Sequence, residues 1–184
     1  RQGIIRSNDK RTILTYDVAS YYPNLAISNN IYPQHLGNTF CKVYKQLYEE
    51  RKSTPKGSPA NAALKLALNG TYGETNNEFS PLYDPAYTMS ITIGGQISLC
   101  MLIEKVVGDC GADMLMANTD GCEFVVDNDK IDRVKEIVAD WEKTVGLQME
   151  LVMYKAMYIK DVNNYYSVYD DNETVKMKGA YEFQ

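Results

Sequence analysis

Met114 to Val126, MLMANTDGCEFVV, decides the fold because it contains two apolar runs separated by a short polar segment. Asp-Gly between two apolar runs is a strong signal for a β-hairpin. The stretch therefore predicts strands over 113–117 and 122–126, joined by a turn that carries Asp120. On this interpretation Asp120 has a structural role only. A functional role requires a second carboxylate in the same surroundings.

The segments on either side of the hairpin alternate between strand and helix patterns. Their periodicity predicts strands over 11–18, 147–159, 165–169 and 175–178, and helices over 38–52, 59–72, 86–107 and 129–145. Ser58 before Pro59 is typical of a helix start, and Gly73 is typical of a helix end. Residues 20–27 are predicted to form a turn around Pro23 and a short apolar segment.

The order of these elements predicts an α+β fold. Without an insertion from about residue 28 to 85, the order is that of a ferredoxin-like split βαβ fold, and the insertion adds a helical hairpin. The first and third strands usually lie side by side at the centre of such a sheet. Asp17 ends the first strand and Asp120 lies in the hairpin before the third. We therefore expect the two carboxylates to meet at one edge of the sheet.

Two carboxylates that repel each other must either share a proton or bind a cation. No His or Cys pattern accompanies them, so the expected cation is Mg²⁺ or Mn²⁺, held by oxygen ligands and substrate phosphates. Two such ions together assist phosphoryl transfer. In the insertion, Lys65, Asn69 and Tyr72 recur at helical spacing on one face, and Arg51 ends the partner helix. A lysine and an arginine across a helical hairpin suit a triphosphate.

Composition is that of an ordinary globular protein, with 45% hydrophobic and 23% charged residues among 184. The net charge of −5 argues against a nucleic-acid-binding protein, but the charge is uneven. Residues 41–65 hold six basic and two acidic residues, and residues 104–150 hold twelve acidic and five basic residues. The longest apolar stretch, residues 91–107, contains Glu104 and Lys105 and is expected to be a buried helix, so no membrane partner is expected. The chain begins without Met, and we expect a fragment of a longer protein.

Three motifs together carry a resemblance to a known family. YDVASYYPNLAI (16–27) resembles motif A of family B DNA polymerases, DxxSLYPS. KLALNGTYG (65–73) resembles their KxxxNSxYG motif, and ANTDG (117–121) resembles their DTDS motif. The order and the helical insertion also fit, most closely to the phage-encoded members. The resemblance extends from about residue 12 to 183 and implies that residues 1–27 and 86–184 form the palm and residues 28–85 the fingers.

The resemblance also implies roles for individual residues. Asp17 and Asp120 match the two catalytic, metal-binding aspartates, and the Val18 carbonyl would complete one metal's shell. The residues matching nucleotide-binding positions are Ser20, Tyr21, Tyr22, Arg51, Lys65, Asn69, Tyr72 and Gly73. Among them, Tyr22 matches the aromatic residue that stacks under the sugar and excludes a 2′-hydroxyl.

Two later segments resemble the parts of the family that hold the primer strand. YIKDVNNYYSVY (158–169) lies where the family has KKxY, with Lys160 and Tyr165 as candidates, although the spacing is two residues wider. KMKGAYE (176–182) resembles KGxE, with Lys178 and Gly179 as DNA-binding candidates. Glu150 lies near a family acidic position beside the metals. The family's first DTDS aspartate is Asn118 here, which removes one carboxylate.

The sequence thus predicts the catalytic core of a DNA-directed DNA polymerase, in which two Mg²⁺ or Mn²⁺ ions assist transfer from a dNTP to a primer 3′-hydroxyl. The expected partners are primer-template DNA and dNTP, and a terminal protein or a processivity factor would be further partners of such an enzyme. The phage resemblance implies action in a host cytoplasm. The alternatives are an RNA-templated polymerase, a nucleotide cyclase, which the insertion argues against, and a catalytically inactive palm-type nucleic-acid-binding module, which Asn118 favours.

Overall fold

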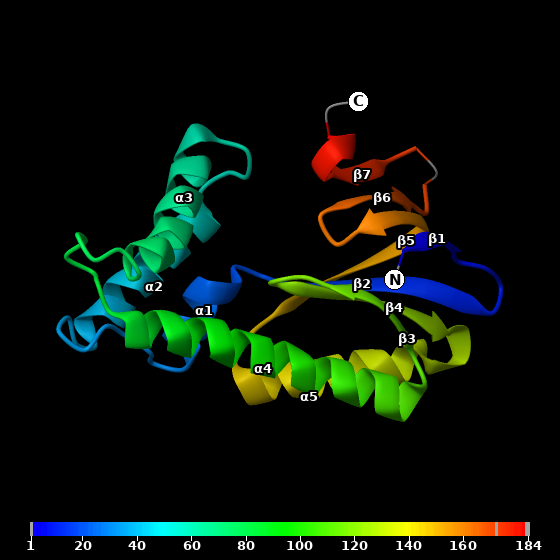
Figure 1. Ribbon diagram of the computed structural model, residues 1–184, viewed down its shortest axis with the longest axis horizontal. Helices are drawn as coiled ribbons and strands as arrows, with labels where there is room; N and C mark the ends of the chain where they lie inside the picture. The colour runs from blue at the N-terminus through cyan, green and yellow to red at the C-terminus, as the bar shows by residue number, and fades with distance from the viewer. Residues whose placement is uncertain (1, 172, 183–184) are drawn as a thin grey trace. The chain divides into compact units, whose positions relative to one another are not determined.

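The computed structural model describes residues 2–171 and 173–182, and the chain divides into two compact units (Figure 1). The first unit comprises Arg1–Val18, Leu99–Thr144 and Gln148–Gln184. The second unit comprises Ala19–Ser98 and Val145–Leu147. The first unit carries the sheet, and the second consists mainly of helices. The division of roles between palm and fingers stays a prediction.

The first unit is built on one antiparallel sheet. Its strands are β1 (Gly3–Arg6), β2 (Arg11–Val18), β3 (Asp113–Ala117), β4 (Gly121–Asp127), β5 (Met149–Asp161), β6 (Asn164–Tyr169) and β7 (Val175–Lys178). They lie in the order β3-β4-β2-β5-β6-β7, and β1 pairs with β5 as well. Every pairing between the described strands is antiparallel. The mixed α+β fold class is confirmed, and β1 is a strand that the sequence analysis missed.

The two faces of the sheet have different coverings. In Figure 1, α5 (Ile131–Val145) and the C-terminal part of α4 (Pro85–Cys110) run along one face of β2 and β4. The buried residues of α5 recur at helical spacing: Val134, Ile137, Val138 and Trp141. The opposite face carries its own buried cluster, which consists of Ile13, Leu115, Met116, Val125, Tyr154, Met157, Ile159 and Tyr165.

The long strand β5 changes the face that its side chains occupy. Its pairing with β6 shifts between Tyr154 and Ala156, so one extra residue is inserted there as a β-bulge. Tyr154 belongs to the buried cluster before the bulge, and Met157 and Ile159 belong to it after the bulge. The intervening Tyr158 therefore points to the opposite face, next to the exposed Ile4 of β1.

The second unit packs three helices and the start of α4. These helices are α1 (Tyr21–Ser28), α2 (Thr39–Ser53) and α3 (Pro59–Glu74). The predicted cap of α3 is confirmed, because the Ser58 hydroxyl accepts a hydrogen bond from the Asn61 amide at 3.2 Å. The buried Tyr44 hydroxyl donates to the Leu68 carbonyl at 2.5 Å and fastens α2 to α3.

Three predictions about the helices differ from the structure. Residues 21–28 form a helix rather than a turn, because Pro23 lies in its first turn, where a missing amide breaks no hydrogen bond. Helix α3 continues through Gly73 to Glu74. Helix α4 ends at Cys110 instead of near Gly108, and the left-handed Gly111 (φ 63°) follows it.

Helix α4 is less buried than its sequence predicts. Four apolar side chains at four-residue spacing are 45–59% exposed: Met89, Ile93, Ile97 and Met101. The most apolar 18-residue window of the helix is 33% buried, so the prediction of a mostly buried helix is wrong. By length and composition alone α4 would suffice to cross a membrane, a criterion that long helices of other proteins also meet.

Candidate active site

Asp17 and Asp120 lie at neighbouring positions of the first unit, as the strand order predicts. β2 and β4 are adjacent, and Asp17 pairs with Gly121, the residue after Asp120. The Val18 amide donates to the Asp120 carbonyl at 2.7 Å, which fastens the hairpin tip to the end of β2. A Cβ atom at Gly121 would collide with the Asp17 carboxylate and lie 2.9 Å from the Tyr16 carbonyl oxygen. Glycine at this position therefore leaves the space that the Asp17 carboxylate occupies.

The turn that presents Asp120 is shaped by Asn118. The Asn118 side-chain oxygen accepts from the Asp120 amide at 3.2 Å and from the Gly121 amide at 2.7 Å. The Asn118 amide in turn donates to the Gly121 carbonyl at 3.0 Å. This is an Asx-type turn, in which a short polar side chain replaces a backbone partner. Asn118 thus stabilises the turn. The sequence analysis considered only the carboxylate that Asn118 removes and did not predict this structural role.

The electrostatics around the two aspartates raise the pKa of Asp120. The surrounding protein reduces the hydration of this carboxyl group, although the residue keeps exposed surface, and the negative Asp17 adds to the rise in pKa. Lys176 and Lys178 of β7 oppose the rise. The Lys176 ammonium also lies 3.5 Å from an Asp17 carboxylate oxygen, in a half-buried ion pair. The Lys176 ammonium is therefore a cation that already pairs with Asp17. The sequence analysis did not predict Lys176 as a residue of this site.

Glu123 is a further acidic residue that the sequence analysis missed. It pairs with Thr15 across β2 and β4, so it projects from the same face as Asp17, two positions away. Its side chain is 1% exposed, and its Oε2 has no hydrogen-bond partner among the described residues. Burial first, and then Asp17, raises the pKa of Glu123 to about 8. A glutamate inside the apolar run CEFVV was the signal that could have identified it.

Glu150 is the third neighbour of Asp17. It lies directly opposite Asp17 on β5, as Gly121 does on β4, and its side chain is exposed. Directly paired residues project from the same face with Cβ atoms about 5 Å apart. Glu150 therefore lies where the resemblance predicts an acidic residue beside the metal-binding aspartates.

The carboxylates fit a divalent cation that completes its coordination elsewhere. No group of three or more His, Cys, Asp or Glu residues is placed to hold a metal ion by itself in the described part of the chain. Mg²⁺ commonly uses one or two carboxylates together with water and substrate phosphates. Burial first, and then the neighbouring Asp17, raises the pKa of Asp120, and a cation bound between the two carboxylates would offset the second effect.

Four of the predicted nucleotide-binding residues contact one another in pairs within the second unit. Ser20 adopts left-handed backbone angles (φ 47°, ψ 57°), and its hydroxyl accepts a hydrogen bond from Arg51 at 2.9 Å. A non-glycine residue in this region is uncommon and often lies at a functional site. The rings of Tyr22 and Tyr72 are in contact, with centroids 4.4 Å apart. The Ser20–Arg51 hydrogen bond joins motif A to the helical insertion, since only Val18 and Ala19 separate Asp17 from Ser20.

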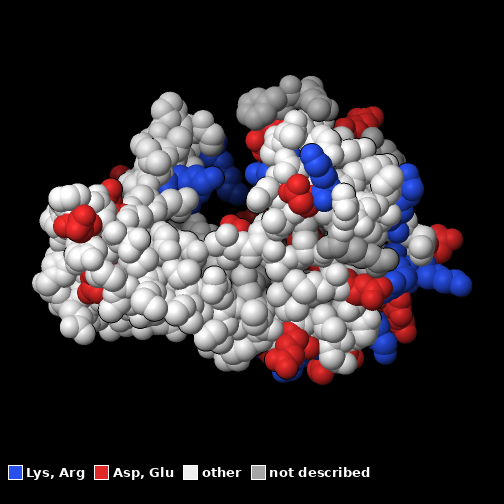
Figure 2. All heavy atoms as spheres, viewed as in Figure 1, with Lys and Arg blue, Asp and Glu red and all other residues white. Residues whose placement is uncertain are grey.

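The other predicted nucleotide-binding residues differ in accessibility. Tyr21 is buried, and its hydroxyl donates to the Gly95 carbonyl at 2.5 Å, so its side chain has a packing role. Lys65, Asn69 and Gly73 are exposed on α3. Figure 2 shows basic side chains gathered at one place on the helical unit, while most of the visible surface of this unit is uncharged. Lys65 is therefore accessible to an anionic ligand.

The predicted primer-binding residues are not all brought together. Tyr165 is 5% exposed and belongs to the buried cluster, and burial raises its pKa to about 12. Lys160 is exposed and lines a groove on the opposite face, with Tyr158 and Tyr166. Lys178 pairs with Tyr165 across β6 and β7 and acts electrostatically on Asp120. Lys178 therefore lies on the carboxylate side of the sheet, and Lys160 does not.

Gly179 follows Lys178 and has a structural reason to be glycine. Its φ of 64° is left-handed, and a Cβ atom there would collide with the Asn163 carbonyl and the Asn164 side chain. The next amide, that of Ala180, donates to the Asn164 side-chain oxygen at 2.8 Å. This turn positions Lys178 at the end of β7.

Comparison with protein-family models and with curated proteins finds no match for this chain. The function is therefore inferred from the three motifs and from the geometry of the carboxylates.

Proposed function

We propose that this chain is the nucleotidyl-transfer core of a DNA-directed DNA polymerase that uses Mg²⁺ or Mn²⁺. One observation carries the proposal: Asp17 on β2 pairs with Gly121, the first residue of the adjacent strand β4. Asp120 precedes Gly121 in a turn that the Asn118 side chain stabilises. These residues belong to two sequence motifs about a hundred positions apart, and both motifs resemble those of family B polymerases.

The fold supports the finer description of the first unit as a ferredoxin-like palm. The strand order β3-β4-β2-β5, with α4 after β2 and α5 after β4, is the order expected for a split βαβ arrangement. β6 and β7 extend this sheet and carry the lysines that reach the carboxylates. The antiparallel helices α2 and α3 of the second unit would then serve as the fingers.

Each unit contributes different chemistry in this proposal. Asp17 and Asp120 hold the divalent ions, which when bound would activate the primer hydroxyl and stabilise the leaving pyrophosphate. Arg51 and Lys65 bind the triphosphate, with the Ser20 hydroxyl orienting Arg51 through their 2.9 Å hydrogen bond. Tyr22, supported by Tyr72, packs against the sugar. Most of the catalytic effect would come from positioning and electrostatics.

A primer-extension assay with matched variants tests the proposal. The chain should extend a DNA primer on a DNA template in the presence of Mg²⁺. Asp17→Asn and Asp120→Asn should each lower the rate on the order of a thousandfold, because a metal ligand contributes several kcal/mol. Asp129→Asn replaces an exposed aspartate of the same unit and should leave the rate unchanged. Absence of extension by the wild-type chain, or wild-type rates in the Asp17 and Asp120 variants, would refute the proposal.

A second candidate, a non-catalytic palm-type module, is favoured by two observations. Asn118 replaces a carboxylate of the family motif, and Lys176 already provides Asp17 with a cation. Titration with Mn²⁺ separates the two functions. A polymerase core should bind Mn²⁺ with an affinity that dNTP increases and Asp120→Asn lowers. A binding module should show neither dependence. Extension on RNA but not DNA templates would instead identify an RNA-templated enzyme.

A further inference from the structure

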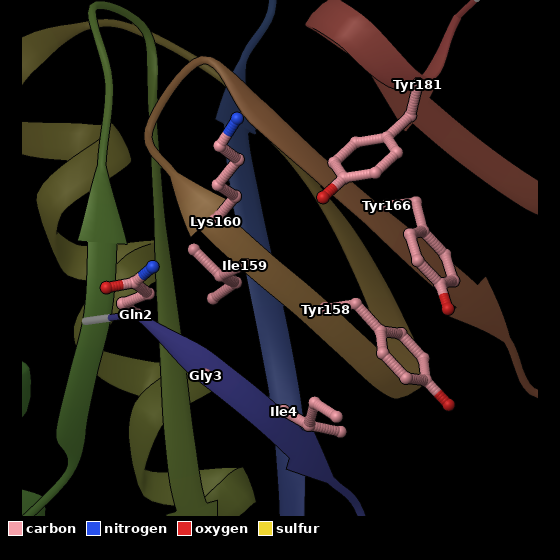
Figure 3. Close-up of a pocket in the computed structure, with 8 residues that line it drawn as sticks. All are labelled: Gln2, Gly3, Ile4, Tyr158, Ile159, Lys160, Tyr166 and Tyr181. Carbon is pink, nitrogen blue, oxygen red and sulfur yellow. The ribbon is translucent and has the colours of Figure 1, made fainter. Parts of the chain in front are cut away.

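A groove with a volume of about 400 Å³ lies on the first unit, on the face of the sheet opposite the carboxylates (Figure 3). Strands β1, β5 and β6 and the 3₁₀ turn η2 (Gly179–Tyr181) form it. In Figure 3 the rings of Tyr158, Tyr166 and Tyr181 line one side, and Lys160 and Gln2 lie on the other. The volume falls within the range typical of small-ligand sites, about 300–1,000 Å³.

The aromatic side of the groove is organised before any ligand binds. Tyr158 and Tyr166 pair directly across β5 and β6, and their rings stack with centroids 4.3 Å apart and planes 7° apart. Tyr181 contacts Tyr166 edge to face at 5.7 Å. The Arg6 guanidinium lies 5.8 Å from the centre of the Tyr158 ring and donates to its hydroxyl at 3.4 Å. Rings held in this way lose little conformational entropy when a ligand packs against them.

The charge of the groove is positive. Lys160 lines the groove, and Arg6 lies beside it against Tyr158. Neither cation forms a salt bridge within residues 2–171 and 173–182. Asp161, the acid beside Lys160, accepts hydrogen bonds from the Asn163 amide and from Asn164. Glu182 pairs with Lys178. Asp161 also interacts electrostatically with Lys160 but forms no ion pair with it among the described residues, so the Lys160 ammonium can still contact an anion.

We infer that this groove binds single-stranded nucleic acid, with a base against Tyr181 and a phosphate beside Lys160. Single-strand sites combine stacking aromatic residues with cations that follow the backbone. A proline-rich peptide would use the tyrosines but would leave the Lys160 ammonium without an anionic partner, so the observations favour nucleic acid over a peptide. The inference does not rest on the proposed polymerase function, because the groove and Asp17 project from opposite faces of the sheet.

Fluorescence anisotropy with a labelled oligothymidylate, in EDTA to exclude metal-dependent binding, tests the inference. Tyr181→Leu should lower the affinity by about fivefold or more, the smallest effect expected for a lost stacking contact. Lys160→Gln should also reduce the slope of log K against log salt by about 0.7, the value for one single-strand phosphate contact. Tyr83→Leu and Lys105→Gln, which replace an exposed tyrosine and an exposed lysine elsewhere, should change neither quantity.

Photocrosslinking with a bromodeoxyuridine-substituted oligonucleotide locates the bound strand. The inference expects crosslinks to Tyr158, Tyr166 or Tyr181. Crosslinks confined to other residues, or equal affinities of the Tyr181 and Tyr83 variants, would overturn it, as would Tyr181-dependent binding of a decaproline peptide without binding of the oligonucleotide. Failure of the proposed function is distinguishable, because Asp17→Asn should lower the rate of primer extension on the order of a thousandfold and leave the metal-free oligonucleotide affinity unchanged.

Discussion

Replacing Glu123 with Gln should make the sheet unit more stable at high pH and leave its stability at low pH nearly unchanged. Glu123 is 1% exposed, its Oε2 has no hydrogen-bond partner in the described part of the chain, and Asp17 projects from the same face two positions away. The ionised form therefore loses its hydration and lies close to a second negative charge. Gln has the same shape and cannot ionise, so the comparison isolates the charge.

The expected magnitude follows from the pKa of Glu123, which rises from 4.5 to about 8 on folding. Between these pH values the folded chain keeps a proton on Glu123 that the unfolded chain has released. Because the folded state then binds more protons, the free energy of unfolding falls as pH rises, by about 1.4 kcal/mol per pH unit. Over the whole interval the wild type should lose about 5 kcal/mol relative to Glu123→Gln.

Urea unfolding in steps from pH 4.5 to 8 measures this difference, with the fluorescence of the only tryptophan as the signal. Trp141 is buried on α5 in the same unit as Glu123, so it reports on the relevant structure. Glu173→Gln, at an exposed position of the β6–β7 turn, is the control and should follow the wild type. Adding Mg²⁺ at pH 8 should restore stability to the wild type more than to Glu123→Gln. Parallel pH profiles for the wild type and Glu123→Gln would refute the reasoning.

Substitutions at three further positions test the local geometry. Asn118→Ala should destabilise the first unit by about 1–2 kcal/mol in urea unfolding, because two amides lose their acceptor, whereas Asn118→Asp keeps an acceptor and should strengthen Mn²⁺ binding on the order of tenfold. Gly121→Ala should weaken Mn²⁺ binding and cost about 1–3 kcal/mol, since its Cβ would collide with Asp17; an unchanged titration would show that this space is not needed. Ser58→Ala should cost about 1 kcal/mol by removing the cap of α3, a loss that Ser58→Thr should largely avoid in thermal unfolding.

The hairpin and the strand that pairs with it were predictable because each has a strong local signal. Residues 11–18 form β2 as predicted, and the hairpin strands agree with β3 and β4 to within one residue. Short apolar runs bounded by turn residues define such strands without knowledge of the rest of the chain. The adjacency of Asp17 and Gly121 then follows from the order of the elements alone. The central part of the candidate site was therefore available from the sequence.

Glu123 and Lys176 were not predictable in the same way. Both residues become neighbours of Asp17 only in the folded sheet. Strand pairing places the side chains from β4 and β7 on the same face as that of Asp17 on β2. Each of the two residues lies in a strand where charged residues at alternate positions normally face solvent. The apolar stripe of α4 was mispredicted in the other direction. Its apolar composition predicts burial, but its side chains are 45–59% exposed.

The bulge in β5 decides on which face of the sheet Lys160 lies. Glu150, Val152 and Tyr154 pair with Asp17, Thr15 and Ile13, so even-numbered residues face the carboxylates in the first half of β5. A regular strand would continue this alternation and place Lys160 on that face. The extra residue between Tyr154 and Ala156 reverses it, which buries Met157 and Ile159 and turns Tyr158 and Lys160 outward. Deleting Lys155 should therefore force a choice between burying a lysine and losing the pairing with β6, and a chain that tolerates the deletion with unchanged stability would show that the bulge does not set the two faces.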